Sequence, residues 1–442
     1  MKRYVIGAAA VLAGLAAFVA AVIFVGTLLG RERPIKVGIL HSMTGTMAGS
    51  ARPLVDAASI ALDEINREGG VLERPVAAVV ADGASEAATF AREAERLIRD
   101  EGVVAIFGCW TSSERKAVKA IVEKYDHVLF YPLQYEGLEE SPNIVYLGSA
   151  PNQQIVPAVK WAIGNVGRRF FLVGSDYVFP HAANSIVRDY VRKWRGQIVG
   201  EAYLPLGSAD VDSVIAEIRR QQPDLILNTL NGDSNIAFFT HLRAAGITPN
   251  LIPTMSFSVA ENELSLLPAD LMAGDYAAWS YFQSVGTTAN AQFVQAFRRR
   301  FGDDRVTSDP IEASYAGVML WAAAANGAGD ERPAAVRRAV VDRSVRGPGG
   351  MIYIDAENRH AWKTVRIGRV LPTRQFEIVW SSDRPIRPEP FPGVRSREQW
   401  DQFLKELYDG WKGNWANPIA RVSISVGEPA GRERLADTAR VP

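Results

Sequence analysis

Few residues of this chain have the type and spacing that catalysis or metal binding requires. The 442 residues include five histidines and a single cysteine, Cys109. No two of the histidines stand at metal-ligand spacing, and one cysteine cannot form a paired-cysteine site. The sequence also lacks a Gly-rich phosphate loop, a dinucleotide-binding glycine motif and a nucleophile elbow. We therefore expect neither a metal nor another cofactor.

One short pattern has the form of a catalytic motif. Ser113 and Lys116 have the SxxK spacing of penicillin-recognising serine enzymes, but the companion motifs SDN and KTG are absent from the sequence. The segment from Thr111 to Glu114 also has the form of a capping box, in which a hydroxyl and a carboxylate start a helix. We interpret it as a helix start and predict that the protein is not an enzyme.

Aromatic, hydroxyl and amide residues gather where short apolar segments end. In open parallel sheets, ligands bind at the carboxyl ends of the strands. These ends carry one carboxylate and no cation, which predicts a small neutral polar ligand. Asp233 would accept hydrogen bonds from N–H groups of that ligand. The candidate residues at these ends are Trp110, Thr111, Ser112, Tyr131, Tyr135, Tyr177, Asp233 and Ser256.

Strands that alternate with helices would bring these positions together. Apolar segments at 35–41, 76–81, 103–108 and 128–131 alternate with helical patterns, and the alternation resumes beyond residue 150. This spacing is typical of βαβ units. It predicts an α/β fold of two lobes, each with a doubly wound, mostly parallel sheet. The segments 364–370 and 376–380 are predicted to form an antiparallel pair; the remaining elements of the second lobe fall at 153–165, 170–174, 184–195, 197–205, 211–221, 224–229, 234–245 and 251–256.

The N-terminus has a different composition from the rest of the chain. No charged residue occurs from Tyr4 to Gly30, and Lys2, Arg3 and Arg31 flank this apolar run. A bilayer core needs about 20 apolar residues in a helix. We predict an uncleaved signal anchor over residues 1–34, with the chain after Arg31 outside the cytoplasm. A cleaved signal peptide is the alternative.

Overall charge argues against one class of partner. Lys and Arg together number 49, as do Asp and Glu, so the formal net charge is zero. A nucleic-acid binder usually carries a basic patch and a high isoelectric point. We therefore predict no nucleic-acid partner.

Long motifs in a fixed order resemble those of a known family. Over roughly residues 35–392 the chain resembles the type I periplasmic binding proteins, in the branch that contains the urea- and short-amide-binding components of ABC transporters. The Trp-Thr pair at 110–111 and the loop at 231–235 are similar to those of the urea-transporter branch. A related cytoplasmic amide sensor typically has Tyr-Met in place of the Trp-Thr pair. The motifs include VGILHSMTGTMA (37–48), FGCWTSSERKAV (107–118), LFYPLQYEG (129–137), GSAPNQQIVPAV (148–159), FFLVGSDYVFP (170–180) and LNTLNGDSN (227–235).

The resemblance implies how the chain is divided. Two lobes would be joined by a hinge of three crossovers, near residues 147–151, 277–282 and 346–351. We expect a C-terminal extension at 393–420 and a disordered tail at 421–442. The expected lobes are 35–147 with 282–345, and 148–281 with 346–392.

The resemblance also implies a site and a function. Trp110, Ser112, Tyr131 and Tyr177 would line an amide pocket, while Leu133 stands where the amide sensor has a threonine. The expected function is that of an extracytoplasmic receptor, held at the periplasmic face of the membrane by its N-terminal helix. It would capture urea or a short aliphatic amide between closing lobes and deliver it to an ABC permease. A membrane-tethered amide sensor is the alternative, and binding of branched-chain amino acids is a less favoured one.

Overall fold

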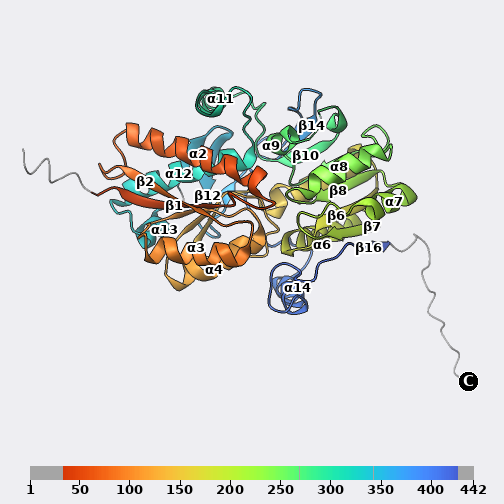
Figure 1. Ribbon diagram of the computed structural model, residues 1–442, viewed down its shortest axis with the longest axis horizontal. Helices are drawn as coiled ribbons and strands as arrows, with labels where there is room; N and C mark the ends of the chain where they lie inside the picture. The colour runs from red at the N-terminus through yellow and green to blue at the C-terminus, as the bar shows by residue number, and fades with distance from the viewer. Residues whose placement is uncertain (1–32, 268, 342, 427–442) are drawn as a thin grey trace, which may run out of the picture.

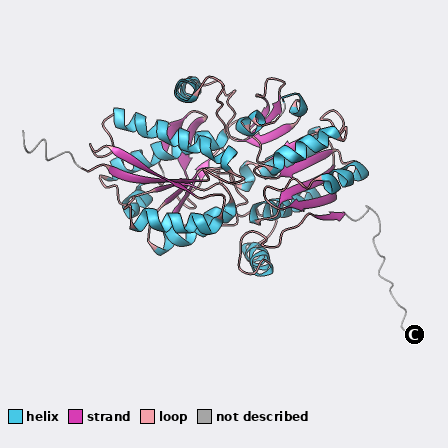
Figure 2. Ribbon diagram, in the orientation of Figure 1, coloured by secondary structure: helices cyan, strands magenta, loops and turns pink. Residues whose placement is uncertain are grey.

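Two sheets form the centres of two lobes in the computed structural model (Figures 1 and 2), which describes residues 33–267, 269–341 and 343–426. Lobe 1 denotes the residues packed around a five-stranded sheet of order β2-β1-β3-β4-β5. All neighbouring strands of this sheet run parallel, which confirms the predicted α/β class. Its strands are β1 (Ile35–His41), β2 (Val76–Asp82), β3 (Ile106–Gly108), β4 (Leu129–Tyr131) and β5 (Ile144–Tyr146).

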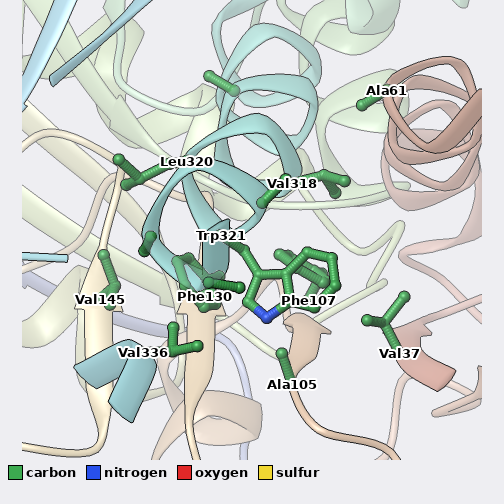
Figure 3. Packing of buried hydrophobic residues seen from close by; sticks show 14 of the residues in the cluster. Val37, Ala61, Ala105, Phe107, Phe130, Val145, Val318, Leu320, Trp321 and Val336 are labelled. Atoms are coloured by element: carbon green, nitrogen blue, oxygen red, sulfur yellow. The ribbon is translucent and has the colours of Figure 1, made fainter. Parts of the chain in front are cut away.

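Helices cover both faces of the lobe 1 sheet because its strands are apolar on both sides. Val37 of β1 packs in one buried cluster with α2 (Ala48–Arg67) and α12 (Asp309–Ala328). Leu40 of the same strand packs in a second cluster, with α3 and α4 on the other face. Figure 3 shows the first cluster, in which Trp321 of α12 meets Phe107 edge-on at 6.1 Å between ring centroids. The other helices of this lobe are α3 (Ala87–Arg99), α4 (Ser112–Lys124), α11 (Thr288–Phe301) and α13 (Pro333–Ala339).

Lobe 2 denotes the residues packed around the second sheet, whose described strands follow the order β15-β14-β10-β9-β8-β6-β7-β16. The inner strands are parallel, whereas β14, β15 and β16 join antiparallel at the edges. The predicted pair near 364–380 is therefore confirmed as β14 and β15. The strands are β6 (Arg169–Ser175), β7 (Gln197–Leu204), β8 (Leu225–Thr229), β9 (Thr254–Ser256), β10 (Tyr276–Trp279), β14 (Arg366–Val370), β15 (Phe376–Ser381) and β16 (Ser423–Val426).

Helices also cover both faces of the lobe 2 sheet. Two buried clusters form its core, one with α5, α6 and α14 and the other with α7, α8 and α9. Both predicted sheets are thus doubly wound. The elements are η1 (Pro151–Gln153), α5 (Ile155–Asn165), α6 (Val178–Lys193), α7 (Asp212–Gln221), α8 (Ser234–Ala244), α9 (Glu261–Ser265), α10 (Ala269–Met272) and α14 (Arg397–Gly410).

A small antiparallel sheet differs from the predicted division of the chain. Its strands β11 (Ser344–Gly347), β12 (Gly350–Ile354) and β13 (Ala361–Trp362) follow α13. Ile352 and Ile354 pack in the core of lobe 1, although residues 346–392 were predicted to belong to lobe 2. The third passage between the lobes therefore follows β13, at 363–365. A short apolar hairpin such as β11–β12 can pack on the core of either lobe. Here β11 contacts α12, which places the hairpin on lobe 1.

The three passages between the lobes, after β5, β10 and β13, are tied together. The hydroxyl groups of Ser149 and Ser280 lie 2.7 Å apart. The Asp309 carboxylate accepts hydrogen bonds from the backbone N–H groups of Ser280 and Tyr281, at 2.9 and 2.8 Å. Arg366, which opens β14, donates to the carbonyl of Ser280. Buried hydrogen bonds thus hold the hinge region together.

The C-terminal region is more ordered than predicted. Helix α14 packs on lobe 2 through Trp400 and Leu404, and β16 pairs with the edge strand β7. Residues 421–426, predicted as part of a disordered tail, thus include a strand; 427–442 lie outside the described residues. An exposed sheet edge offers unpaired backbone groups to any extended segment. The side chains of β16 are exposed. Val422, Ile424 and Val426 alternate with Ser423 and Ser425, which is a strand pattern that the prediction of a disordered tail overlooked.

The predicted membrane anchor at 1–34 lies outside the described residues, except for its last two. Within the part of the chain that the structure describes, no helix is long and apolar enough to cross a membrane.

Close approach of β1 and β3 gives a stability prediction. A Cβ atom on Gly108 would lie 2.0 Å from the carbonyl oxygen of Leu40, so Gly108→Ala must separate the two strands. We expect it to lower the free energy of unfolding by about 1–3 kcal/mol in guanidinium chloride. Gly164→Ala is the matched control, because nothing lies within 4 Å of that position in α5 and alanine favours a helix by about 0.5–1 kcal/mol. Equal effects of the two changes would contradict this account.

Candidate functional site

The turn from β3 into α4 brings the first candidate residues to the carboxyl edge of the lobe 1 sheet. Cys109 has a φ of +68° and donates its backbone N–H to Leu40 at 3.0 Å, which turns the chain sharply after β3. Thr111 then caps α4 by accepting a hydrogen bond from the Glu114 N–H at 3.2 Å. The predicted capping box is confirmed, and it makes Thr111 a helix-capping residue.

Glu114 completes the capping box with one carboxylate oxygen, while its other oxygen has no hydrogen-bond partner among the described residues. One carboxylate oxygen accepts from the N–H groups of Trp110 and Thr111, at 2.7 and 2.9 Å. The other oxygen, Oε1, is buried and has no hydrogen-bond partner within the described residues. Burial raises the pKa of Glu114 to about 7, although these N–H groups lower it. A side chain of the protein therefore engages the backbone donors of Trp110 and Thr111.

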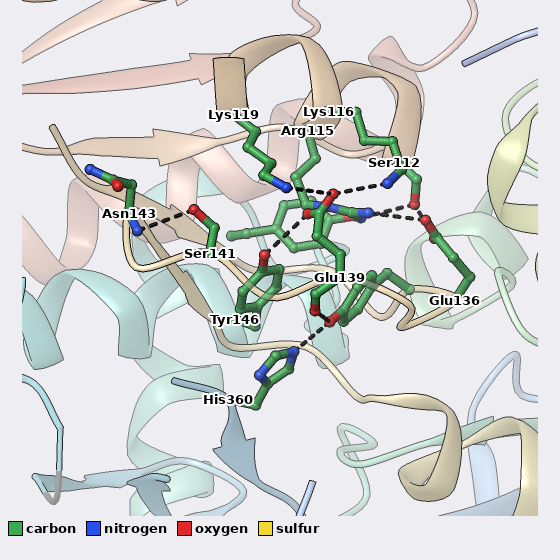
Figure 4. A network of polar contacts seen from close by, with 12 residues as sticks. Ser112, Arg115, Lys116, Lys119, Glu136, Glu139, Ser141, Asn143, Tyr146 and His360 are labelled. Carbon is green, nitrogen blue, oxygen red and sulfur yellow. Dashed lines mark hydrogen bonds and ion pairs between the residues drawn. The ribbon is translucent and has the colours of Figure 1, made fainter. Parts of the chain in front are cut away.

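A fully buried arginine lies beneath the start of α4 (Figure 4). The Arg115 guanidinium donates to the Ser112 hydroxyl at 2.9 Å, to Glu136 at 3.0 Å and to Glu139 at 2.9 Å. The Ser112 hydroxyl donates in turn to Glu136 at 2.5 Å. Ser112 is therefore held between a cation and an anion at the edge of the site.

Ion pairs link the charged members of this cluster. Lys116 donates to the second oxygen of Glu139 at 2.9 Å, so two buried cations face two buried carboxylates. Burial alone would raise the pKa of Glu139, but Lys116 and Arg115 hold it well below its usual range. Burial alone would lower the pKa of Arg115, but Glu139 and Glu136 raise it well above its usual range. These ion pairs hold Arg115 and Glu139 in their charged forms, and the Lys119 ammonium lies 3.7 Å from Glu139 as well.

Tyr131, the last residue of β4, and Tyr135, which follows the strand, use their hydroxyl groups within lobe 1. Tyr131 donates to the carbonyl of Trp110 at 2.7 Å, which fixes the backbone beside the site. Tyr135 donates to the carbonyl of Glu139 at 3.1 Å and also contacts His360. The guanidinium carbon of Arg115 lies 4.4 Å from the Tyr135 ring centroid. Tyr131 thus borders Trp110, whereas Tyr135 supports the charged cluster from below.

Lobe 2 supplies Tyr177, the residue before α6. Its side chain is buried, and no described residue forms a hydrogen bond with its hydroxyl group. Burial, together with the nearby Tyr131, Glu136 and Glu114, raises the pKa of Tyr177 well above its usual range. Tyr177 is therefore a buried aromatic residue of lobe 2 with an unengaged hydroxyl.

The lobes meet directly around these residues. The Trp110 indole donates to Asn231 of lobe 2 at 3.2 Å, and the Gln134 amide donates to the carbonyl of Phe257 at 2.8 Å. Ser256 is buried in lobe 2, where its hydroxyl accepts from Asn228 at 3.2 Å. These contacts describe two lobes closed against each other.

Asp233 lies apart from the buried group. Its side chain is exposed, and its backbone N–H donates to the Thr46 hydroxyl of lobe 1 at 3.3 Å. It therefore stands at the rim where the lobes touch. Trp110 and Ser112 are buried in lobe 1 and Tyr177 is buried in lobe 2, whereas Asp233 is exposed.

Sequence reasoning missed several polar residues of this region. Arg115 and Glu114 stand in the helix-start motif itself, and Glu136 follows Tyr135 directly. The conclusion that no cation stands near these strand ends was incomplete, because Arg115 lies one helical turn inside α4 and its position under Ser112 depends on the loop after β4. Buried polar atoms without partners among the described residues also occur at this edge, on His41, Gln134, Ser234 and Ser258.

The raised pKa of Glu114 predicts a pH-dependent stability. Because the folded state holds this proton more tightly than the unfolded chain, the contribution is complete below pH 4.5 and is lost as pH rises through about 7. Relative to Glu114→Gln, the wild-type free energy of unfolding should fall by about 3 kcal/mol between pH 4.5 and 8. Guanidinium chloride unfolding at several pH values measures this difference, and glutamine keeps the capping acceptor.

The control for this experiment is Glu68→Gln, at an exposed position at the end of α2. It should leave the pH profile parallel to that of the wild type. If the free energy of unfolding of Glu114→Gln varies with pH in parallel with that of the wild type, the pKa of Glu114 is not raised by folding.

Comparisons with known proteins agree with this architecture. A solute binding protein of an ABC transporter from Rhodopseudomonas palustris HaA2, in complex with p-hydroxybenzoic acid, is 20% identical, with a TM-score of 0.73 over 80% of this chain and 98% of that chain. A leucine binding protein from Thermotoga maritima MSB8 is 19% identical, with a TM-score of 0.70 over 78% of this chain and 98% of that chain. At these identities the likeness shows the fold.

Curated relatives match parts of the chain. The Leu/Ile/Val-binding protein homolog 8 of Brucella abortus (strain 2308) is 21% identical over 290 residues, which are 61% of this chain and 70% of the relative. A limonene hydroxylase of Geobacillus stearothermophilus is 35% identical over 118 residues, but the match covers 27% of this chain and only 22% of that protein. The family model of the periplasmic binding protein domain matches residues 35–397, which is most of the chain. The chain therefore belongs to the periplasmic binding protein domain family.

Proposed function

We propose that this protein is an extracytoplasmic solute-binding receptor that binds urea or a short aliphatic amide between its lobes. The observation that carries the proposal is the neutralised arginine: Arg115 is engaged by Glu136 and Glu139. A ligand carboxylate would therefore find no unpaired cation among the described residues of the candidate site. Burying a charge without a partner is costly, and a neutral ligand avoids this cost.

The hydrogen-bonding groups at the lobe boundary complement an amide. Glu114 has an unpartnered acceptor oxygen that an amide N–H could use, and Tyr177 has a hydroxyl that could donate to the amide carbonyl. Trp110 provides a flat wall beside them. For so small a ligand each hydrogen bond matters, because leaving one buried group unpaired costs about 1–3 kcal/mol. This requirement would favour urea or acetamide over apolar ligands.

Delivery to an ABC permease is part of the proposal. Two lobes that close around a ligand provide two conformations that a membrane partner can distinguish. Family membership supports a periplasmic location, and the likeness to a solute binding protein of an ABC transporter supports a role in transport. The apolar N-terminal segment would hold the receptor near its permease.

Isothermal titration of the full-length protein tests the ligand class. We expect urea or acetamide to bind at least about tenfold more tightly than leucine or p-hydroxybenzoate, since each amide avoids an unpaired carboxylate. Leucine and p-hydroxybenzoate are the informative competitors, because one similar structure is that of a leucine binding protein and another is a complex with p-hydroxybenzoic acid. Tighter binding of either competitor than of both amides would overturn the proposal.

A second prediction separates the buried site from its rim. Tyr177→Phe removes an unengaged hydroxyl, so the free energy of unfolding should change by less than about 0.5 kcal/mol. Amide affinity should fall about 3- to 10-fold, through loss of one hydrogen bond. Asp233→Asn, at the exposed rim, is the matched control and should change affinity less than about twofold. The assignment of Tyr177 fails if its variant binds like the wild type, or if Asp233→Asn shows the larger loss.

A further inference from the structure

The segment that follows α14 pairs with the loop that carries Tyr177. The backbone N–H of Val178 donates to the carbonyl of Trp415 at 2.9 Å, and Tyr177 forms an antiparallel bridge with Ala416. The N–H of Asn417 donates to the carbonyl of Asp176 at 3.1 Å. The backbone of a C-terminal segment thus sets the position of a loop more than two hundred residues earlier in the chain.

Side chains strengthen the same pairing. The Asn417 amide donates to one oxygen of the Asp176 carboxylate at 2.7 Å. The other oxygen contacts the His181 ring at 2.8 Å, and that ring meets Trp411 edge-on at 5.0 Å between centroids. Asp176, directly before Tyr177, is therefore held from both sides.

The same C-terminal region also contacts lobe 1. The Lys116 ammonium lies 4.3 Å from the ring centroid of Trp415, and it donates to Glu139 of the buried cluster. Arg397, the first residue of α14, pairs with Glu140 at 3.1 Å. In Figure 1, α14 lies beside α6, next to the junction of the two lobes. The C-terminal region therefore spans the boundary on the side of the candidate site.

We propose that residues 411–417 form a clasp that holds Tyr177 in place and favours the closed arrangement of the lobes. The clasp is anchored on lobe 2 by its pairing with residues 176–178 and reaches lobe 1 through Trp415 and Lys116. An ammonium over an indole ring is attracted most strongly when water is excluded, and Lys116 is buried. Contacts that exist only when the lobes meet shift the equilibrium toward closure by their differential free energy.

The clasp makes Trp415 and Asn417 positioning residues, which act through Tyr177 and Lys116. Its effect on ligand affinity rests on the proposed function, whereas its effect on closure does not. Opening the lobes would separate Trp415 from Lys116 but leave the pairing of Asn417 with Asp176 intact. The two residues therefore affect different properties. Trp415 affects the fraction of molecules whose lobes are closed, and Asn417 affects the order of the loop that carries Tyr177.

Spin labels on the two lobes test closure without any ligand. The labels go on cysteines placed at the exposed positions Glu86 in lobe 1 and Asp210 in lobe 2, and the native Cys109 is buried. In the full-length protein, Trp415→Ala should shift the distance distribution to longer values. Trp415→Phe keeps a ring over Lys116 and should restore the wild-type distribution. Lys405→Ala, at an exposed position of α14, is the control and should match the wild type.

Ligand dissociation and thermal unfolding complete the experiment. Asn417→Ala and Trp415→Ala should each accelerate urea dissociation at least fivefold, with folded protein confirmed by circular dichroism at the assay temperature. A wild-type distance distribution for Trp415→Ala, or lowered melting temperatures with unchanged dissociation in both variants, overturns the clasp. A shifted distribution in a protein that binds neither urea nor acetamide supports the clasp and refutes the proposed ligand.

Discussion

The guanidinium group of Arg115 is fully buried between Glu136 and Glu139, and the candidate site is built around this ion pairing. The loop after β4 has no regular secondary structure, yet its two carboxylates bind it to the start of α4. Removing one partner of such a cluster leaves an uncompensated buried charge, which typically costs about 3–5 kcal/mol. The cluster therefore fixes the geometry around Ser112.

The sheets bring this cluster to the lobe boundary. The parallel strands of one sheet end at one edge, so residues that follow β3 and β4 converge at the edge of the lobe 1 sheet, and residues that follow β6 and β8 converge at the edge of the lobe 2 sheet. Gly108 lets β1 and β3 approach closely, and Cys109 turns the chain into α4. Trp110 consequently reaches Asn231 of the opposite lobe. This one contact between the lobes depends on the local backbone at Gly108 and Cys109.

The relatives illustrate how one fold serves different ligands. Solved structures with TM-scores near 0.7 include proteins in complex with hydroxybenzoates and a leucine binding protein. In this chain Glu114 occupies backbone donors at the start of α4, and Arg115 is already paired. A shared fold does not by itself fix the ligand, which depends on the side chains of the site. The C-terminal extension adds contacts on both lobes and so connects the site to a region beyond the family model, which ends at residue 397.

The sequence by itself determined the alternation of strands and helices, the capping box at Thr111 and the strand ends that carry Trp110 and Tyr177. These features depend on local periodicity and on residues within one helical turn, which the sequence displays directly. Tertiary structure decided the pairing of Arg115 with Glu136, the placement of β12 on lobe 1 and the exposure of Asp233. Each of these depends on which distant segments meet. Ion pairs and burial are set by distances in space, and a pattern along the chain does not specify those distances.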